Sequence, residues 1–351
     1  MRTESDIIER MSNGLARGIS RHKPGWLCAG IGDDAAVLRN RFAARAGRNV
    51  DDLVLSCDAF LENTHFLSNV HPPDAIGYKA LARATSDLAA MGAVPRFFML
   101  SLALPANRTG AWLDGLIKGM AQAAREFGMA LIGGDTSQSA TVIMNITVGG
   151  DIAAGRALAR SGARPGDGIY VSGTLGTAQL GLELILRGLH RDAKWRHLLG
   201  QHLRPKIQLE LGCWLSGGRR GQPIASAATD TSDGLSTDLT HICQSSGVNA
   251  RIYADQILAV EVPESLQRLG LDPLKLALHG GEDYQLLFTV PAAHERRIPK
   301  SFHGTRITKI GEILSVKSSR NKGFIELVDA AEKKTLLAPG GWDSFRTTPR
   351  K

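Results

Sequence analysis

Carboxylates occur along this sequence at points where apolar segments break. An ionised carboxylate that is buried without a partner is costly, so each of these groups needs a cation or a hydrogen-bond donor. Single aspartates at such points commonly serve as turn or helix-cap residues, and that role stays open for Asp233 and Asp283. The stretches concerned are IGDDAAVL (31–38), LSCDAF (55–60), ATSDLAAMGA (84–93), LIGGDTS (131–137), ATDTSDGL (228–235) and HGGEDYQLL (279–287).

Asp87 is the aspartate that a turn or cap role explains least. It lies in an Ala-rich helical run, about one turn before the helix stops. Asp is a poor helix former, and the helix dipole disfavours a negative charge at that end. A cation or an arginine beside it should compensate. Asp33 and Asp34 are adjacent in an extended stretch, where successive side chains face opposite sides. One of them is expected to hold a metal and the other to serve the loop or the metal's surroundings.

The chemistry of these donors favours magnesium. The acids offer at least five oxygen ligands with almost no sulfur or imidazole among them, and Mg²⁺ prefers oxygen and bridges carboxylates to phosphates. Gly133 and Gly134 precede Asp135, and paired glycines are used where backbone passes close to a ligand. The sequence carries no GxxxxGK[ST] loop, no GxSxG elbow and no HExxH helix. A lone histidine such as His65 and a terminal aromatic such as Trp342 are by themselves more often structural.

Composition and charge limit the classes of partner and compartment that the sequence allows. The 351 residues carry a formal net charge of +8, but their Lys and Arg are dispersed rather than clustered, which disfavours a nucleic-acid partner. No apolar run approaches the ~20 residues of a membrane span, and the N-terminus lacks the pattern of a signal peptide. The four cysteines stand far apart without a CxxC pair. We therefore expect a cytoplasmic protein with reduced thiols and neither a nucleic-acid nor a membrane partner.

Alternating strand and helix patterns predict two α+β domains, residues 1–151 and 152–351. The patterns predict a buried strand over 130–135 that runs into a turn, and a long helical stretch after residue 188. Further helices are predicted over 1–20, 74–93, 110–128, 173–188 and within 231–247, and strands over 35–40, 51–60, 96–105, 140–151, 168–173, 224–230 and 282–290.

Eight stretches in this order resemble the thiamine-monophosphate kinase family. They are IGDDAAVL, LSCDAFLENTHF, YKALARATSDLAAMGAVP, LIGGDTS, GRALARSGARPGD, ATDTSDGLSTDL, HGGEDYQLLFTV and GGWDSF, and they cover residues from about 30 to 345. The resemblance implies the fold of the aminoimidazole-ribotide synthetase superfamily, with two mixed α+β domains and a homodimer barrel formed by the N-terminal sheets. It also implies ATP and several Mg²⁺ ions as cofactors, and thiamine monophosphate as the substrate that is phosphorylated to thiamine diphosphate.

Carried over residue by residue, the resemblance implies three groups of site residues. Arg160 would meet the ATP phosphates, together with Gly134, Asp135 and Ser232 around the nucleotide. The thiamine phosphate would meet His65, Glu282 and Trp342. The implied metal ligands are Asp34, Ser56, Cys57, Asp58, Asp87, Asp135, Asp230 and Asp233. The family commonly has Thr at the position of Cys57, and a thiol is a poor Mg²⁺ ligand, so any contact there should come from the backbone carbonyl.

The implied reaction is a direct in-line transfer without a covalent enzyme nucleophile. A phosphate oxygen of thiamine monophosphate is largely deprotonated near neutral pH (second pKa about 6), so no strong base is required. Positioning and electrostatics would then supply most of the rate. Three alternatives remain: another ATP-using enzyme of the superfamily with a different acceptor, a non-catalytic nucleotide-binding member, and a nucleic-acid-binding module suggested only by the charge.

Overall fold

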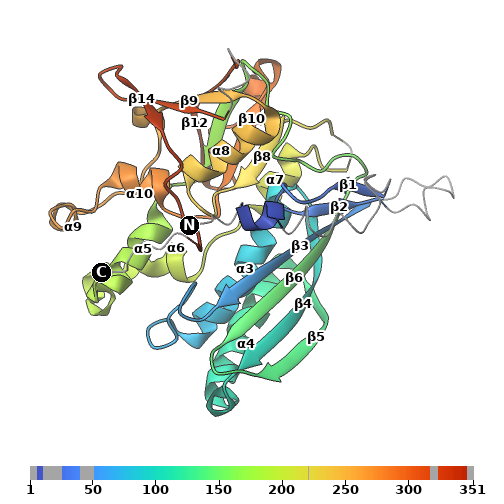
Figure 1. Cartoon of the computed structure of the whole chain (residues 1–351), viewed down its shortest axis with the longest axis vertical. Helices are drawn as coiled ribbons and strands as arrows, with labels where there is room; N and C mark the ends of the chain where they lie inside the picture. The colour runs from blue at the N-terminus through green and yellow to red at the C-terminus, as the bar shows by residue number, and fades with distance from the viewer. Residues whose placement is uncertain (1–5, 11–25, 40–50, 220, 317–322, 346–351) are drawn as a thin grey trace.

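The computed structural model describes residues 6–10, 26–39, 51–219, 221–316 and 323–345. Two mixed sheets with flanking helices build the chain, and Figure 1 shows the C-terminal sheet above the N-terminal one. Of the helix predicted over 1–20, residues 6–10 are helical, and the rest lies outside the described residues.

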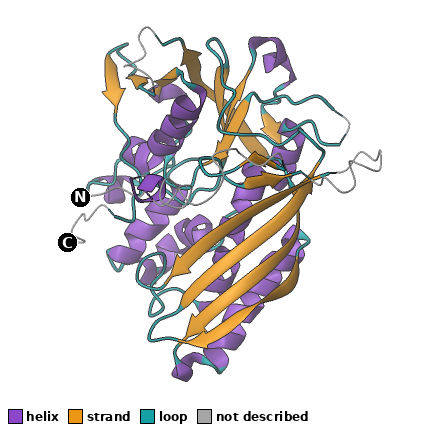
Figure 2. Cartoon of the chain, turned by 45° about the vertical axis from the view of Figure 1, so that its right-hand side comes forward, coloured by secondary structure: helices purple, strands orange, loops and turns teal. Residues whose placement is uncertain are grey.

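The N-terminal sheet has six strands in the order β1-β2-β3-β6-β4-β5. All neighbours are antiparallel except β4 and β5, which run parallel. The helices α3 and α4 cover one side of this sheet (Figure 2). The bounds are β1 Leu27–Ala29, β2 Ala36–Leu38, β3 Asp52–Leu61, α3 Pro73–Ala90, β4 Val94–Leu104, α4 Ala111–Phe127, β5 Ala130–Gln138 and β6 Ile143–Ile152.

Close packing fixes α3, the helix that carries Asp87. Fourteen of its eighteen residues are buried, because it contacts the sheet on one side and α4, α7 and β8 on others. A Cβ at Gly119 of α4 would overlap the Asp74 carbonyl oxygen, and one at Gly212 of α7 would overlap that of Ala89. The absence of side chains at these two glycines lets α4 and α7 lie directly against α3.

The C-terminal sheet has the order β14-β13-β9-β12-β7-β10-β8, with β11 paired to β12. Strands β7 and β10 and the edge strand β8 are buried at every residue, as expected for strands covered on both faces. The bounds are β7 Gly168–Ser172, α5 Thr177–Leu186, α6 Gly200–Leu203, α7 Leu209–Leu215, β8 Ala227–Asp230, α8 Leu235–Ser246, β9 Asn249–Tyr253, α9 Glu264–Gln267, α10 Pro273–His279, β10 Leu286–Val290, β11 Ser301–Phe302, β12 Thr305–Leu314, β13 Ile325–Val328 and β14 Lys334–Leu337.

Two local predictions were wrong. The stretch predicted as a buried strand ending in a turn is the edge strand β5, exposed at every residue and continuing through Asp135 to Gln138. The long helix predicted after residue 188 is a series of short segments, with 3₁₀ helices at Leu189–Arg191 and Ala193–Leu199 followed by the four-residue α6. Within the part of the chain that the structure describes, no helix has both the length and the apolar character needed to cross a membrane.

Candidate active site

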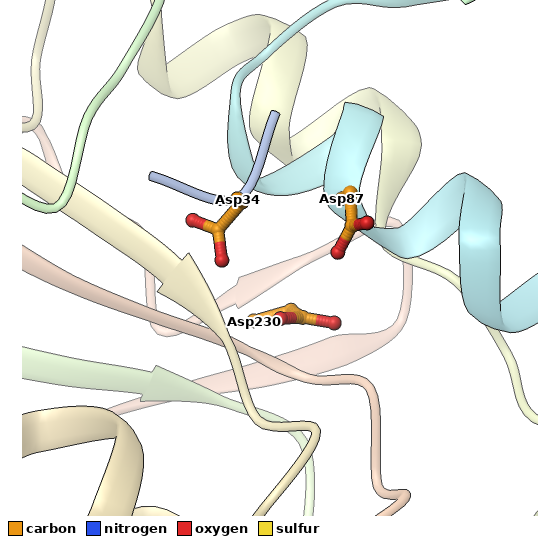
Figure 3. A group of neighbouring side chains, drawn as sticks. All are labelled: Asp34, Asp87 and Asp230. Atoms are coloured by element: carbon orange, nitrogen blue, oxygen red, sulfur yellow. The ribbon is translucent and has the colours of Figure 1, made fainter. Parts of the chain in front are cut away.

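Three carboxylates meet where the two sheets adjoin. Asp34 comes from the segment before β2, Asp87 from the last turn of α3 and Asp230 from the end of β8, and their side chains point into one space (Figure 3). One oxygen of each lies within 4.8 Å of the others. Asp34 and Asp230 are buried and Asp87 is half-buried. Three acids from three distant segments thus share a space the size of one or two cations.

Hydrogen bonds hold these carboxylates in place while leaving part of each available. Ser86 Oγ donates to Asp230 Oδ2 at 2.6 Å, and Thr229 Oγ1 donates to Asp34 Oδ1 at 2.9 Å. Ser56 Oγ donates to Asp87 Oδ2. The other oxygens of the two buried acids, Asp34 Oδ2 and Asp230 Oδ1, have no hydrogen-bond partner among the described residues. Unpartnered buried carboxylate oxygens are costly without a cation, so this donor set fits Mg²⁺.

The pKa values of the acids report the same crowding. Burial and the neighbouring Asp34 carboxylate raise the pKa of Asp230 to about 7. Burial, followed by the charges of Asp58 and Asp230, raises the pKa of Asp87 well above its usual range. Without a cation, burial and mutual repulsion therefore disfavour the ionised forms of Asp87 and Asp230, and a bound cation would offset both effects.

Asp33 and Asp34 separate as adjacent residues of an extended stretch do. Asp33 Oδ1 accepts the backbone N–H of Arg160 at 2.6 Å, whereas Asp34 Oδ1 accepts the Arg160 side chain, with Nη2 at 2.6 Å and Nε at 3.1 Å. Although burial acts in the opposite direction, the Asp34 charge raises the pKa of Arg160 above its ordinary value. The Arg160 guanidinium is therefore a fixed positive charge at the edge of the three acids.

Ser56 and Asp58 lie on one face of β3, and Cys57 lies on the other. Ser56 reaches Asp87, and Asp58 Oδ2 accepts from Arg83 Nε at 3.2 Å. The Cys57 thiol is exposed and contacts Asn145 and Thr147 of β6, on the side of the sheet away from α3. Its side chain does not face the three acids, so only its backbone carbonyl remains as a donor toward them.

Asp135 does not join the three acids within this chain. Three strand spacings separate β5 from β3, which at about 4.8 Å each is about 14 Å. Across the sheet, Asp135 is in register with Ser101, Asn145 and Ala59, whose side chains share one face. Because Ala59 follows Asp58 in β3, this face is opposite to the one that carries Asp58. There it is exposed, and Ser137 Oγ donates to it at 3.4 Å.

Four of the remaining predicted residues lie close together in the C-terminal half. The backbone N–H of Glu282 donates to the Ser232 carbonyl at 2.8 Å, and that of Trp342 donates to the Asp233 carbonyl at 2.9 Å. Glu282 has a positive φ of 66°. Trp342 is 42% exposed and lines a cavity of about 360 Å³ that also includes Gly281 and Lys275. Asp233 is not one of the three grouped acids.

A buried ion pair fixes Glu282, and the sequence patterns had not singled out its partner. Lys79 of α3 is 2% exposed, and its Nζ lies 2.7 Å from Glu282 Oε2. Although burial raises it, the charges of Lys79 and His202 lower the pKa of Glu282 to about 2. Burial and the nearby Arg83 charge lower the pKa of His65 to about 4, so this imidazole is neutral. The signal that could have found Lys79 and Arg83 is their spacing: with Asp87 they recur every four residues along one face of α3.

Family models first identify the broad class of protein to which this fold and acidic site belong. Residues 32–152 match the family described as AIR synthase related protein, N-terminal domain, and residues 164–322 match its C-terminal domain. The two mixed α/β domains have the AIR synthase type of fold, as the resemblance implied.

Within that class, individual relatives are more specific. The chain is 40% identical over 269 residues to the thiamine-monophosphate kinase of Salmonella typhimurium, covering 75% of this chain and 76% of that protein. It is 35% identical over 323 residues to the Bacillus subtilis thiamine-monophosphate kinase, covering 90% and 93%. A solved structure described as AaThiL complexed with AMPPCP and TMP superposes with a TM-score of 0.78 at 29% identity, covering 98% and 99%. The chain belongs to the thiamine-monophosphate kinase family.

Proposed function

We propose that this protein transfers the γ-phosphate of ATP to thiamine monophosphate, which yields ADP and thiamine diphosphate. The observation that carries the proposal is the convergence of Asp34, Asp87 and Asp230, with two buried unpartnered oxygens, in a chain of the thiamine-monophosphate kinase family. This convergence is the feature that the transfer of phosphate between two anions requires.

The proposed reaction is an in-line displacement at phosphorus. An oxygen of the acceptor phosphate forms the new P–O bond to the γ-phosphorus, and the bond to the β-phosphate oxygen breaks with its electron pair leaving on ADP. The attacking oxygen is already ionised near neutral pH, since the second phosphate pKa is about 6. The neutral His65 is therefore not needed as a base, and the protein's task is to orient the two phosphates and offset their repulsion.

Asp34, Asp87 and Asp230 would hold Mg²⁺, with Ser56, Asp58, Asp233 and the Cys57 carbonyl as further candidate ligands. Bound Mg²⁺ would supply positive charge that offsets the phosphate repulsion. Arg160 adds a fixed cation for the nucleotide phosphates, next to Asp34. We assign Ser232 to the nucleotide, and His65, Glu282 and Trp342 to the acceptor. Because Lys79 neutralises Glu282, that carboxylate adds little net repulsion toward a phosphate.

We further propose that two copies assemble through the bare side of the N-terminal sheet, forming a barrel. Among the described residues, helices cover only one side of this sheet (Figure 2). The other side and the edge strand expose apolar side chains, among them Leu131 at 59%, Ile132 at 58% and Met99 at 42%. An exposed apolar edge strand readily pairs with another chain. Asp135 and Gly134 lie on this edge, so we assign them to the nucleotide and metal site of the second copy.

A direct assay tests the function. Purified protein with ATP and Mg²⁺ is offered thiamine monophosphate and a panel of other phosphate acceptors, and ADP and thiamine diphosphate are measured. Formation of thiamine diphosphate that depends on Mg²⁺ is expected. Preference for another acceptor would indicate a different enzyme of the superfamily, and ATP binding without turnover would indicate a non-catalytic member. Salt-sensitive retention of RNA or DNA without ATP use would indicate the nucleic-acid alternative.

The assembly is tested separately by sedimentation. Leu131→Asp should shift the protein from dimer to monomer, because it places a charge on the proposed contact strand. Leu336→Asp is the matched control, since Leu336 is 74% exposed on β14, the edge strand of the other sheet. A dimer that survives Leu131→Asp would place the interface elsewhere, and a wild-type monomer would refute the assembly.

A further inference from the structure

Arg83 is a cation in the acidic site with an unused donor. It lies on α3 one turn before Asp87, and its side chain is 17% exposed. Its Nε donates to Asp58 Oδ2 at 3.2 Å. The guanidinium carbon lies 5.3 Å from the centroid of the Phe60 ring, and that ring stacks on His65 at 5.6 Å. Two contacts of different kinds thus fix the plane of this guanidinium.

The Nη1 of Arg83 is buried and has no hydrogen-bond partner among the residues described. A buried cationic donor left without an acceptor is costly, and no described carboxylate accepts from this nitrogen. Asp58 takes the Nε, and Glu282 takes the Lys79 ammonium at 2.7 Å. Burial lowers the pKa of Arg83, but the charges of Asp58 and Glu282 outweigh burial and raise that pKa, so Arg83 remains a cation. The structure therefore holds a charged, oriented N–H group with no acceptor.

The position of this group identifies the chemistry of its acceptor. On α3, Arg83 lies one turn from the grouped acid Asp87 and one turn from Lys79, the partner of Glu282. Its guanidinium lies over the Phe60 ring that stacks on His65. The acceptor of the proposed function carries a phosphate, and a guanidinium with one edge held by a carboxylate presents its other N–H groups to a phosphate oxygen.

We propose that Arg83 binds the phosphate group of the acceptor and makes the site prefer a phosphorylated acceptor over its unphosphorylated alcohol. The proposal rests on the proposed function, because it assigns a role within that same site. It adds a substrate-binding residue to the two other cations of the site, Lys79, which pairs with Glu282, and Arg160, which pairs with Asp34. The three cations then have separate tasks.

Binding of two ligands that differ only in the phosphate tests the proposal. Thiamine monophosphate and thiamine are titrated calorimetrically into wild type, Arg83→Gln and Arg83→Lys, with Mg²⁺ and without nucleotide. Wild type should prefer thiamine monophosphate, and Arg83→Gln should lower this preference tenfold or more, as loss of a charge-assisted hydrogen bond does. Affinity for thiamine should stay within about threefold, since the lost contact is to phosphate alone. Arg83→Lys, which keeps the charge but not the planar fork, should fall between them.

The matched control is Arg251→Gln. Arg251 is also a partly buried arginine, at 25% exposure, paired with Glu312 and Glu326 of the C-terminal sheet. It should leave both affinities unchanged. A preference ratio altered less than twofold in both Arg83 variants, an equal loss of both ligands, or a wild type that binds thiamine as tightly as its phosphate would overturn the proposal. If Arg83→Gln does not fold, Arg83→Lys decides.

Turnover separates the two claims. The proposed function stands or falls on whether wild type forms thiamine diphosphate, whereas the role of Arg83 stands or falls on the binding ratio. An active wild type whose ratio is insensitive to Arg83 retains the function and loses the inference. An inactive wild type whose ratio collapses in Arg83→Gln loses the function and retains a phosphate site.

Discussion

Asp230→Asn should stabilise the metal-free protein while abolishing its response to Mg²⁺. Asp230 is 1% exposed, and one oxygen each of Asp34 and Asp87 lies within 4.8 Å of one of its own. Its Oδ2 accepts from Ser86 at 2.6 Å, a bond that an asparagine oxygen also accepts. The substitution therefore removes a charge and keeps the local geometry.

The magnitude follows from the pKa of Asp230, which burial and Asp34 raise from 3.8 to about 7. An acid with a raised pKa binds its proton more tightly in the folded state, so stability falls as pH rises from the unfolded pKa to the folded one. The penalty is absent below pH 4, grows between pH 4 and 7, and is constant above. At 1.36 kcal/mol per pKa unit it reaches at most about 4 kcal/mol at pH 8. Asn relieves it, so we expect a gain of about 2 to 4 kcal/mol at pH 8 and almost none near pH 4.

Urea unfolding in EDTA at the two pH values measures this gain, with exposed Asp114→Asn on α4 as the control. In saturating Mg²⁺ the order should reverse, because the wild type gains stability from the bound ion and the variant has lost a ligand. Turnover of the variant should fall at least about a hundredfold, as expected when charge stabilisation is removed from a phosphoryl transfer. Equal stability of the two proteins at pH 8 without metal, together with equal stabilisation by Mg²⁺, would refute a cation site at these acids.

Three further predictions test the assembly, the packing of α3 and the departure at Cys57. Asp34→Asn and Asp135→Asn should each lose turnover by orders of magnitude while staying folded, and refolding them as a mixture should restore about a quarter of wild-type activity, because half of the dimers would contain one intact site; no recovery would place Asp135 in its own chain's site. Gly212→Ala should lower the free energy of unfolding by about 1 to 3 kcal/mol in urea, since its Cβ would overlap the Ala89 carbonyl oxygen, whereas Gly200→Ala, with open space around it, should not. Cys57→Ala should keep turnover and Mg²⁺ dependence within about threefold, because a metal contact through the backbone carbonyl does not need the side chain; a large loss would show that the thiol itself is used.

The sequence predicted elements well where periodicity and chain breaks agree. The helix predicted over 74–93 is α3, at Pro73–Ala90, and it ends before Gly92, whose φ is +73°. The helix predicted over 110–128 is α4, closed by the left-handed Gly128. The prediction of a buried strand failed at β5. An apolar run such as ALI predicts burial, but it does not show whether the covering surface belongs to the same chain or to another. In a single chain these residues are exposed.

The sequence predicts the types of ligand in the site, but only partly which residues lie together in it. Oxygen donors at chain breaks drew attention to Asp34, Asp87 and Asp230, which the fold brings together. Strand register, which one sequence does not give, places Asp135 on the far face of the sheet and turns Cys57 away. The cations were missed because Lys and Arg on a helix are ordinarily solvated, and only tertiary packing shows that Lys79 is 2% exposed.

One helix sets the distances within the proposed site. Lys79, Arg83 and Asp87 recur every four residues on α3, so neighbours among them are about 6 Å apart along the axis. Lys79 (which pairs with Glu282), Arg83 and the candidate metal ligand Asp87 are thus separated along the helix by distances close to the size of a phosphate group. Because α3 is packed directly against α4 and α7, these steps do not depend on a mobile loop. A rigid spacing of this kind favours direct transfer between two phosphates, since the main requirement of that reaction is to hold them at a fixed separation.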